Sequence, residues 1–122
     1  MRKNRDEQYA RKALELLEGT TEVKSTQNGK AAAFCPTVIS IGLLPALLVY
    51  SDDKERQSIL ADIWKIIKED NNLNTKEYRD ILSYVTGSTD DRHLMRERIM
   101  AAANAYKKAL RTYPEVSGGA TT

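Results

Sequence analysis

Few side chains in this sequence of 122 residues have the type and spacing that catalysis or metal binding requires. The single cysteine, Cys35, and the single histidine, His93, lie far apart, whereas a zinc site needs several such ligands together. None of the six glycines begins the turn, followed by Lys and Ser or Thr, that holds phosphates in nucleotide-binding loops. We therefore expect no metal and no cofactor. Cys35 is interpreted as a buried packing thiol rather than a nucleophile, and His93 as a surface histidine near a helix start rather than a general base.

Two pairs of adjacent carboxylates, Asp52–Asp53 and Asp90–Asp91, are the remaining candidates for holding a divalent cation. Each pair stands where a helix is expected to begin, and a carboxylate there stabilises the helix dipole. Adjacent residues of a helix also point in different directions. We therefore interpret both pairs as helix caps.

A helical ribonuclease of the HEPN class would need an arginine at a fixed short distance before its histidine. The positions at that distance before His93 hold Thr86, Gly87 and Ser88. Because the motif is missing, we predict that the chain is not an enzyme and acts by binding. A helical nuclease of another kind is the alternative.

The elements that would position these residues are predicted to be helices. No segment alternates apolar and polar residues as a strand does, whereas helix caps and helical apolar spacing recur along the chain. A chain of this length forms one domain. We predict an all-α, compact single-domain bundle of about six helices over residues 1–115, followed by a disordered tail over 116–122. The expected helices span about 4–18, 30–41, 45–50, 51–69, 74–86 and 88–112, the fifth opened by a capping box of Asn74 and Glu77.

The fourth expected helix carries the strongest core signal. Its apolar residues recur on one broad face: Ile59, Leu60, Ile63, Trp64, Ile66 and Ile67. The most apolar stretch, residues 31–50, is broken by Pro36, Gly42 and Pro45, so we assign it to the core rather than to a membrane span. Its flanks do not resemble a signal peptide, and nothing else indicates export, so we expect a cytoplasmic location.

The last expected helix carries a basic face. At about 100° per residue, four of its cations fall within about 100° of one another. They are Arg92, Arg96, Lys107 and Arg111. The small Ala103 lies in the same sector, so a continuous stripe is predicted beside an apolar face that includes Ile99 and Tyr106. Cations at such spacing can follow a phosphate backbone, and the net charge over residues 90–113 is +3.

The first expected helix offers a second, smaller basic face. Arg5, Tyr9 and Lys12 lie within about 60° of one another, which places an aromatic ring between two cations. Aromatic rings stack on the bases of single-stranded RNA. The alternative is that these cations are solvated or paired with nearby carboxylates, with Tyr9 at the edge of the core. The residues alone leave both interpretations open.

Several short motifs follow one another in an order that resembles a known family. They are Tyr9-Ala10-Arg11-Lys12-Ala13, Cys35-Pro36-Thr37-Val38-Ile39 leading into Gly42-Leu43, Ala46-Leu47-Leu48-Val49-Tyr50, and Leu94-Met95-Arg96-Glu97 on to Tyr106-Lys107-Lys108-Ala109. In this order, over about residues 5–113, the chain resembles the small subunit of the type III-B CRISPR effector, the Cmr or RAMP-module complex. It departs from the family's pattern at Cys35, Met95 and Asn104, where members often carry leucine, threonine and tryptophan.

The resemblance implies an all-helical, non-catalytic protein of antiviral defence. Members of the family stack with further copies of themselves beside the subunits that hold the guide RNA, and they line the channel where guide and target RNA pair. The implied partners are other Cmr subunits, guide RNA and target RNA, with no membrane and no small-molecule substrate. We expect the two basic faces to supply the RNA contacts: Arg5, Lys12, Arg92, Arg96, Lys107 and Arg111. A helical protein-binding adaptor without RNA contact, and the small subunit of the related type III-A effector, are the alternatives.

Overall fold

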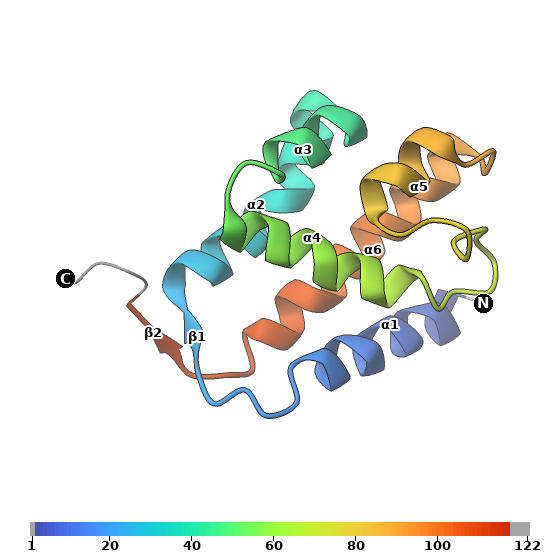
Figure 1. The fold of residues 1–122 in the computed structure, drawn as a ribbon. Coiled ribbons are helices and arrows are strands. Elements are labelled where there is room, and N and C mark those ends of the chain that lie inside the picture. The colour runs from blue at the N-terminus through green and yellow to red at the C-terminus, as the bar shows by residue number, and fades with distance from the viewer. Residues whose placement is uncertain (1, 118–122) are drawn as a thin grey trace.

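The computed structural model describes residues 2–117, with side chains from Arg5 onward. Over that range the chain forms six helices and one pair of very short strands, which confirms the predicted mostly α-helical fold. The helices are α1 (Arg2–Leu16), α2 (Ser25–Ile41), α3 (Leu43–Val49), α4 (Lys54–Ile67), α5 (Ile81–Gly87) and α6 (Arg92–Leu110). In Figure 1, α4 crosses the middle of the molecule with α1 below it, and α3 and α5 lie above it on opposite sides. Within the described range, no helix combines the length and the apolar character needed to cross a membrane.

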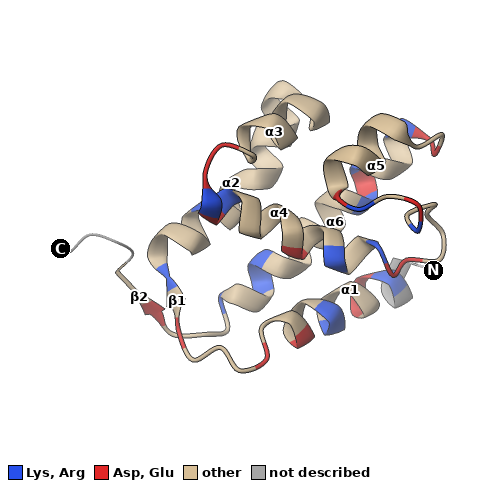
Figure 2. Ribbon diagram, in the orientation of Figure 1, with Lys and Arg blue, Asp and Glu red and all other residues tan. Residues whose placement is uncertain are grey.

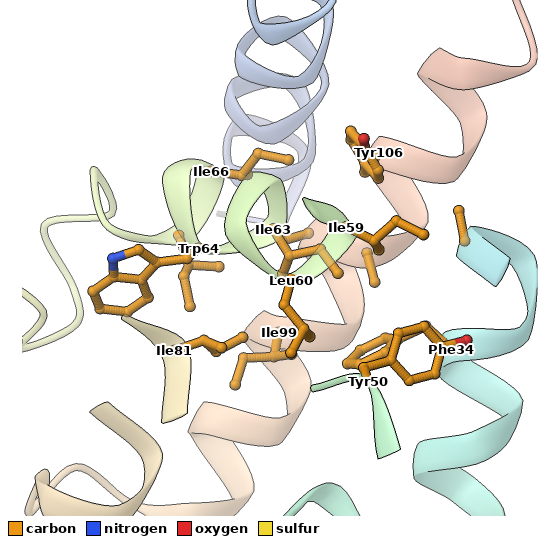
Figure 3. Close-up of a cluster of buried hydrophobic side chains, with 14 of the residues drawn as sticks. Phe34, Tyr50, Ile59, Leu60, Ile63, Trp64, Ile66, Ile81, Ile99 and Tyr106 are labelled. Atoms are coloured by element: carbon orange, nitrogen blue, oxygen red, sulfur yellow. The ribbon is translucent and has the colours of Figure 1, made fainter. Parts of the chain in front are cut away.

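The core lies between α4 and α6, and the neighbouring helices add apolar side chains to it. All six residues predicted on the fourth helix are buried on α4. α6 packs against α1, α2 and α4, and its Ile99 is fully buried. In Figure 3, Ile66 lies on the side of α4 toward α1, whereas Ile59 and Ile63 lie toward Ile99, with Phe34 and Tyr50 nearby. The last two rings meet edge to face, with centroids 5.1 Å apart. α6 is therefore a central helix, covered by three others along much of its length.

Gly42 turns the chain sharply between α2 and α3. Its φ of 98° is a conformation that residues with a side chain rarely adopt, and its N–H donates to the Val38 carbonyl at 2.8 Å. α3 then folds back along α2, where the Tyr50 hydroxyl donates to the Lys30 carbonyl at 2.5 Å. α2 and α3 together form a hairpin, which we call the α2–α3 hairpin.

The prediction of helix boundaries is wrong around α5, which begins at Ile81. The capping box that forms there joins Asp80 and Ser83, rather than Asn74 and Glu77. Asn74 lies in the preceding loop and donates its backbone N–H and its side-chain amide to Asp90, at 2.8 and 3.0 Å. That partner lies far along the chain, so local spacing gives no sign of it.

The sequence pattern does not predict the two strands, because two residues are too few to show an alternation. β1 (Val23–Lys24) and β2 (Glu115–Val116) pair in parallel, with Val23 opposite Glu115 and Lys24 opposite Val116. Val23 is buried, so the pair closes one end of the core. The strand includes Val116, the first residue of the predicted tail. Ser117 is described without regular secondary structure, and residues 118–122 of that predicted tail lie outside the described residues.

Candidate nucleic-acid interface

The four cations predicted on the last helix lie on α6 or at its C-terminal end. None of them forms an ion pair with a residue that the structure describes. Arg92 and Arg111 are exposed, and Arg96 and Lys107 are half-buried. α2, which packs on this helix, contains no Asp or Glu. Because the four charges have no ion pair among the described residues, they remain available to an anionic partner.

The predicted stripe is not continuous, because α2 covers its middle. Ala103 is only 2% exposed, which corrects the expectation of an open sector there. On either side of it, the Cys35 thiol of α2 lies 3.6 Å from the Met100 carbonyl oxygen and 3.8 Å from Asn104 Oδ1. The four cations therefore form two groups, separated by about 16 Å of helix axis. We call them the N-terminal pair (Arg92, Arg96) and the C-terminal pair (Lys107, Arg111).

The cations predicted on the first helix are already paired. Arg5 contacts Asp6 at 3.0 Å and Glu97 of α6 at 3.6 Å, and only 15% of its side chain is exposed. Lys12 contacts Glu69 at 3.1 Å, and this hydrogen bond raises the pKa of Lys12 above its ordinary value. On α1, therefore, Arg5 and Lys12 pair with nearby carboxylates, as the alternative interpretation expects. Figure 2 shows this mixture of basic and acidic residues along α1, and basic residues on the part of α6 nearest β1.

Tyr9 is not available to stack on a base, because it belongs to the core. It is 2% exposed, and its hydroxyl donates to Asp70 Oδ2 at 2.5 Å. Arg98 of α6 contacts the same oxygen, and the Asn72 N–H donates to the other one at 2.9 Å. This buried network joins α1 to α6 through the loop after α4. Sequence reasoning misses Asp70 and Arg98, since neither stands in a motif.

The network shifts the pKa values of its members in opposite directions. Burial raises the pKa of Tyr9, and the hydrogen bond to Asp70 raises it further. Burial alone would also raise the pKa of Asp70. The hydrogen bonds from Tyr9, Asn72 and Arg98, together with the charge of Arg98, outweigh burial and hold the pKa of Asp70 below its ordinary value. Asp70 is therefore a structural carboxylate that is stable in its ionised form.

The residues first considered for chemistry have structural surroundings. Cys35 is half-buried, and burial raises the pKa of its thiol, which disfavours the reactive thiolate. His93 is exposed on the first turn of α6. Asp53 caps α4 and Asp91 caps α6, each accepting a backbone N–H. In the described part of the chain, no three His, Cys, Asp or Glu side chains gather as a metal site requires. That the chain is not an enzyme stays a prediction.

Two further surfaces of the molecule carry apolar side chains. A groove of about 450 Å³ runs between α1 and α6, and we call it the α1–α6 groove. Its apolar lining consists of Ala10, Leu14, Ala101, Ala105 and Ala109. The α2–α3 hairpin exposes four large apolar side chains, namely Ile39, Ile41, Leu48 and Val49. Exposed apolar side chains in such numbers are typical of surfaces that bind other proteins.

No family model, curated protein or solved structure matches this chain. Its function is therefore inferred from the fold, from the placement of charged and apolar side chains, and from the order of the sequence motifs. Together these features define a small helical protein with a divided basic surface on its central helix and separate apolar surfaces.

Proposed function

We propose that this chain is a non-catalytic structural subunit of a type III-B CRISPR RNA-targeting effector in the cytoplasm, and that it contacts RNA through the two cation pairs of α6. Copies stack into a filament and line the channel that holds guide and target RNA. The observation that carries the RNA contact is the absence of ion pairs at these four cations within the described structure, while Arg5 and Lys12 of α1 are paired. The order of motifs over about residues 5–113 supports the assignment to the effector.

The geometry of α6 favours recognition of the phosphate backbone rather than of base sequence. Two pairs of cations about 16 Å apart along a helix can contact one strand at two places. Each phosphate contact adds modest affinity that depends on salt. One copy therefore binds weakly, and a row of copies on one RNA gains affinity through multivalency. Sequence selectivity comes from the pairing of guide and target.

The test is a charge-neutralised variant in the assembled complex. Arg96→Gln, Lys107→Gln and Arg111→Gln together should weaken target-RNA binding. The slope of log affinity against log salt should fall by about 0.7 for each phosphate that the protein no longer neutralises. The matched control removes the same charge from exposed lysines on other elements. It combines Lys54→Gln, Lys68→Gln and Lys76→Gln. Normal assembly with an unchanged salt slope in the first variant would exclude α6 as the RNA-binding element.

The type of effector is tested by purification from the native host. Guide RNA and RAMP subunits of the type III-B complex are the expected co-purifying partners. Backbone subunits of the type III-A effector would instead assign the chain to that related complex. A preparation with neither RNA nor these subunits would contradict both assignments.

A second candidate function is a helical protein-binding adaptor without RNA contact. The α1–α6 groove and the exposed side chains of the α2–α3 hairpin favour it, because they suit apolar protein partners. RNA crosslinking of the assembled complex separates the two functions. Crosslinks on neighbouring subunits but none on this chain would favour the adaptor.

A further inference from the structure

The C-terminal pair borders a shallow hollow that holds an aromatic ring beside a cation. The hollow has a volume of about 530 Å³ and lies between the first turns of α2 and the end of α6. Its lining consists of Ser25, Asn28, Gly29, Ala32, Arg111, Tyr113 and Glu115. Ser25, Gly29 and Ala32 of α2 form one side of the hollow. Because these residues are small, space remains in front of the larger side chains on the other side.

The end of α6 and the strand pair hold these side chains in place. Arg111 is the residue at which α6 ends, and its side chain is exposed. Tyr113 is half-buried, and its hydroxyl donates to the Leu17 carbonyl at 3.3 Å, which fixes one edge of the ring. β2 follows at once and pairs with β1, so that the exposed Lys24 lies at the same end of the molecule.

We propose that this hollow binds an unpaired RNA nucleotide, with its base against the Tyr113 ring and its phosphate near Arg111. The inference rests on the proposed function, because it gives the C-terminal pair a more specific ligand than a phosphate backbone. An aromatic ring beside a cation suits a nucleotide, because the ring stacks on the base while the cation binds the phosphate. In a duplex the faces of the bases are covered by their neighbours, so only an unpaired nucleotide can use the ring.

Glu115 restricts what else the hollow can hold. Its carboxylate accepts a hydrogen bond from the Asn28 side-chain amide at 2.8 Å, so it is held at the hollow. A fixed negative charge opposes a second phosphate. It is compatible with the amino group of a base, which donates to carboxylates. The hollow therefore suits one nucleotide rather than a run of phosphates, and it favours bases with an amino group over uracil.

The test compares single-stranded and duplex RNA on the full chain. Fluorescein-labelled oligonucleotides of one mixed sequence, single-stranded or annealed to the complement, are titrated and followed by fluorescence anisotropy. Tyr113→Leu should weaken single-strand binding about tenfold and leave duplex binding unchanged. The matched control, Tyr113→Phe, keeps the ring and should keep single-strand affinity. An equal loss on both RNAs, or no loss on either, would overturn the proposal.

Two further measurements separate this inference from the proposed function. If Arg111→Gln and the triple α6 variant change binding to neither RNA, both the proposed function and the nucleotide site fail. If they weaken binding while Tyr113→Leu makes no distinction between the two RNAs, only the nucleotide site fails. Should Tyr113→Leu disturb folding, photocrosslinking of the wild-type chain to single-stranded RNA that carries 6-thioguanosine, a base that keeps its amino group, decides the matter. We expect the crosslinked peptide to contain Tyr113, and crosslinks confined to other peptides would overturn the site.

Discussion

α1 and α6 carry the same kind of basic side chain in two different states. On α1, Arg5 and Lys12 contact carboxylates of α1 itself, of α6 and of the segment after α4. On α6, the N-terminal and C-terminal pairs have no such contact in the described part of the chain. For the C-terminal pair, the difference arises in the neighbouring residues. From residue 98 to residue 114 the chain has no acidic residue, and the packed helix α2 has none either.

Carboxylates on the helix itself and on the elements packed against it together decide whether a cation is free to bind a ligand. A helical wheel places charges around one axis and contains no information about the facing helix. We therefore expect the polar groups of α1 to act on stability and the N-terminal and C-terminal pairs of α6 to act on binding. Substitutions on the two helices test that division, beginning with the largest expected effect.

The largest effect is expected at the carboxylate that joins α1 to α6. Asp70→Ala leaves Arg98 in the interior without its partner, so the free energy of unfolding should fall by about 3 kcal/mol or more. Tyr9→Phe, the matched control, removes a single hydrogen bond and should cost about 1 kcal/mol. Urea unfolding measures both. Equal and small losses in the two variants would show that the network is not what holds α1 in place.

Asp70 should also make the free energy of unfolding depend on pH in the acidic range. Its pKa is below the ordinary value in the folded chain, so it contributes stability that is fully present above its pKa in the unfolded chain, about 3.9. That contribution is lost as the pH falls through the lower, folded pKa. Thermal melts at pH values from neutral to strongly acid should therefore show a steeper loss for wild type than for Asp70→Asn. Parallel curves would contradict this role.

A carboxylate introduced on α2 should pair with Arg111, as carboxylates already pair with Arg5 and Lys12 of α1. Gly29 lies on α2 at the hollow beside Arg111, and a side chain added there meets open space. Gly29→Glu should therefore supply the carboxylate that α2 lacks and weaken RNA binding several-fold by pairing Arg111. Gly29→Ala is the matched control. It adds a single methyl group without a charge, so it should change binding far less than Gly29→Glu does, and it should raise the free energy of unfolding by about 0.5–1 kcal/mol because glycine disfavours helix. Equal RNA affinity in the two variants would show that Arg111 takes no part in binding.

Much of the fold follows from sequence patterns because burial repeats with the period of a helix. The apolar face of α4 is buried as predicted, and so is the face of α6 that contains Ile99. The failures have a common physical origin. Ala103 is small and compatible with either surface or core, and only the position of α2 decides between them. Tyr9 presents the same ambiguity, which its partner Asp70 resolves from another part of the chain.

The candidate site is predictable only in part for the same reason. The four cations of α6 can be identified, since they lie on one helix and share its periodicity. Their division into two pairs cannot, because it depends on where α2 crosses. The hollow at Tyr113 brings together side chains from α2, the end of α6 and β2, and no local pattern connects segments so far apart.

The smallest effects are expected from single lysines, and they provide the closest comparison of the two helices. Lys12→Gln removes a contact with the exposed Glu69, and surface pairs of this kind contribute less than about 1 kcal/mol. Lys107→Gln removes no ion pair within the described structure, so its effect on unfolding should be at least as small. The two variants should differ in RNA binding. Lys107→Gln should lower the salt slope by about 0.7, while Lys12→Gln leaves it unchanged. Measurement of unfolding and of salt-dependent binding on the same two proteins checks this. If Lys12→Gln lowered the salt slope as much as Lys107→Gln does, Lys12 would bind RNA in spite of its ion pair. Pairing with a carboxylate would then not explain why a cation is excluded from RNA binding.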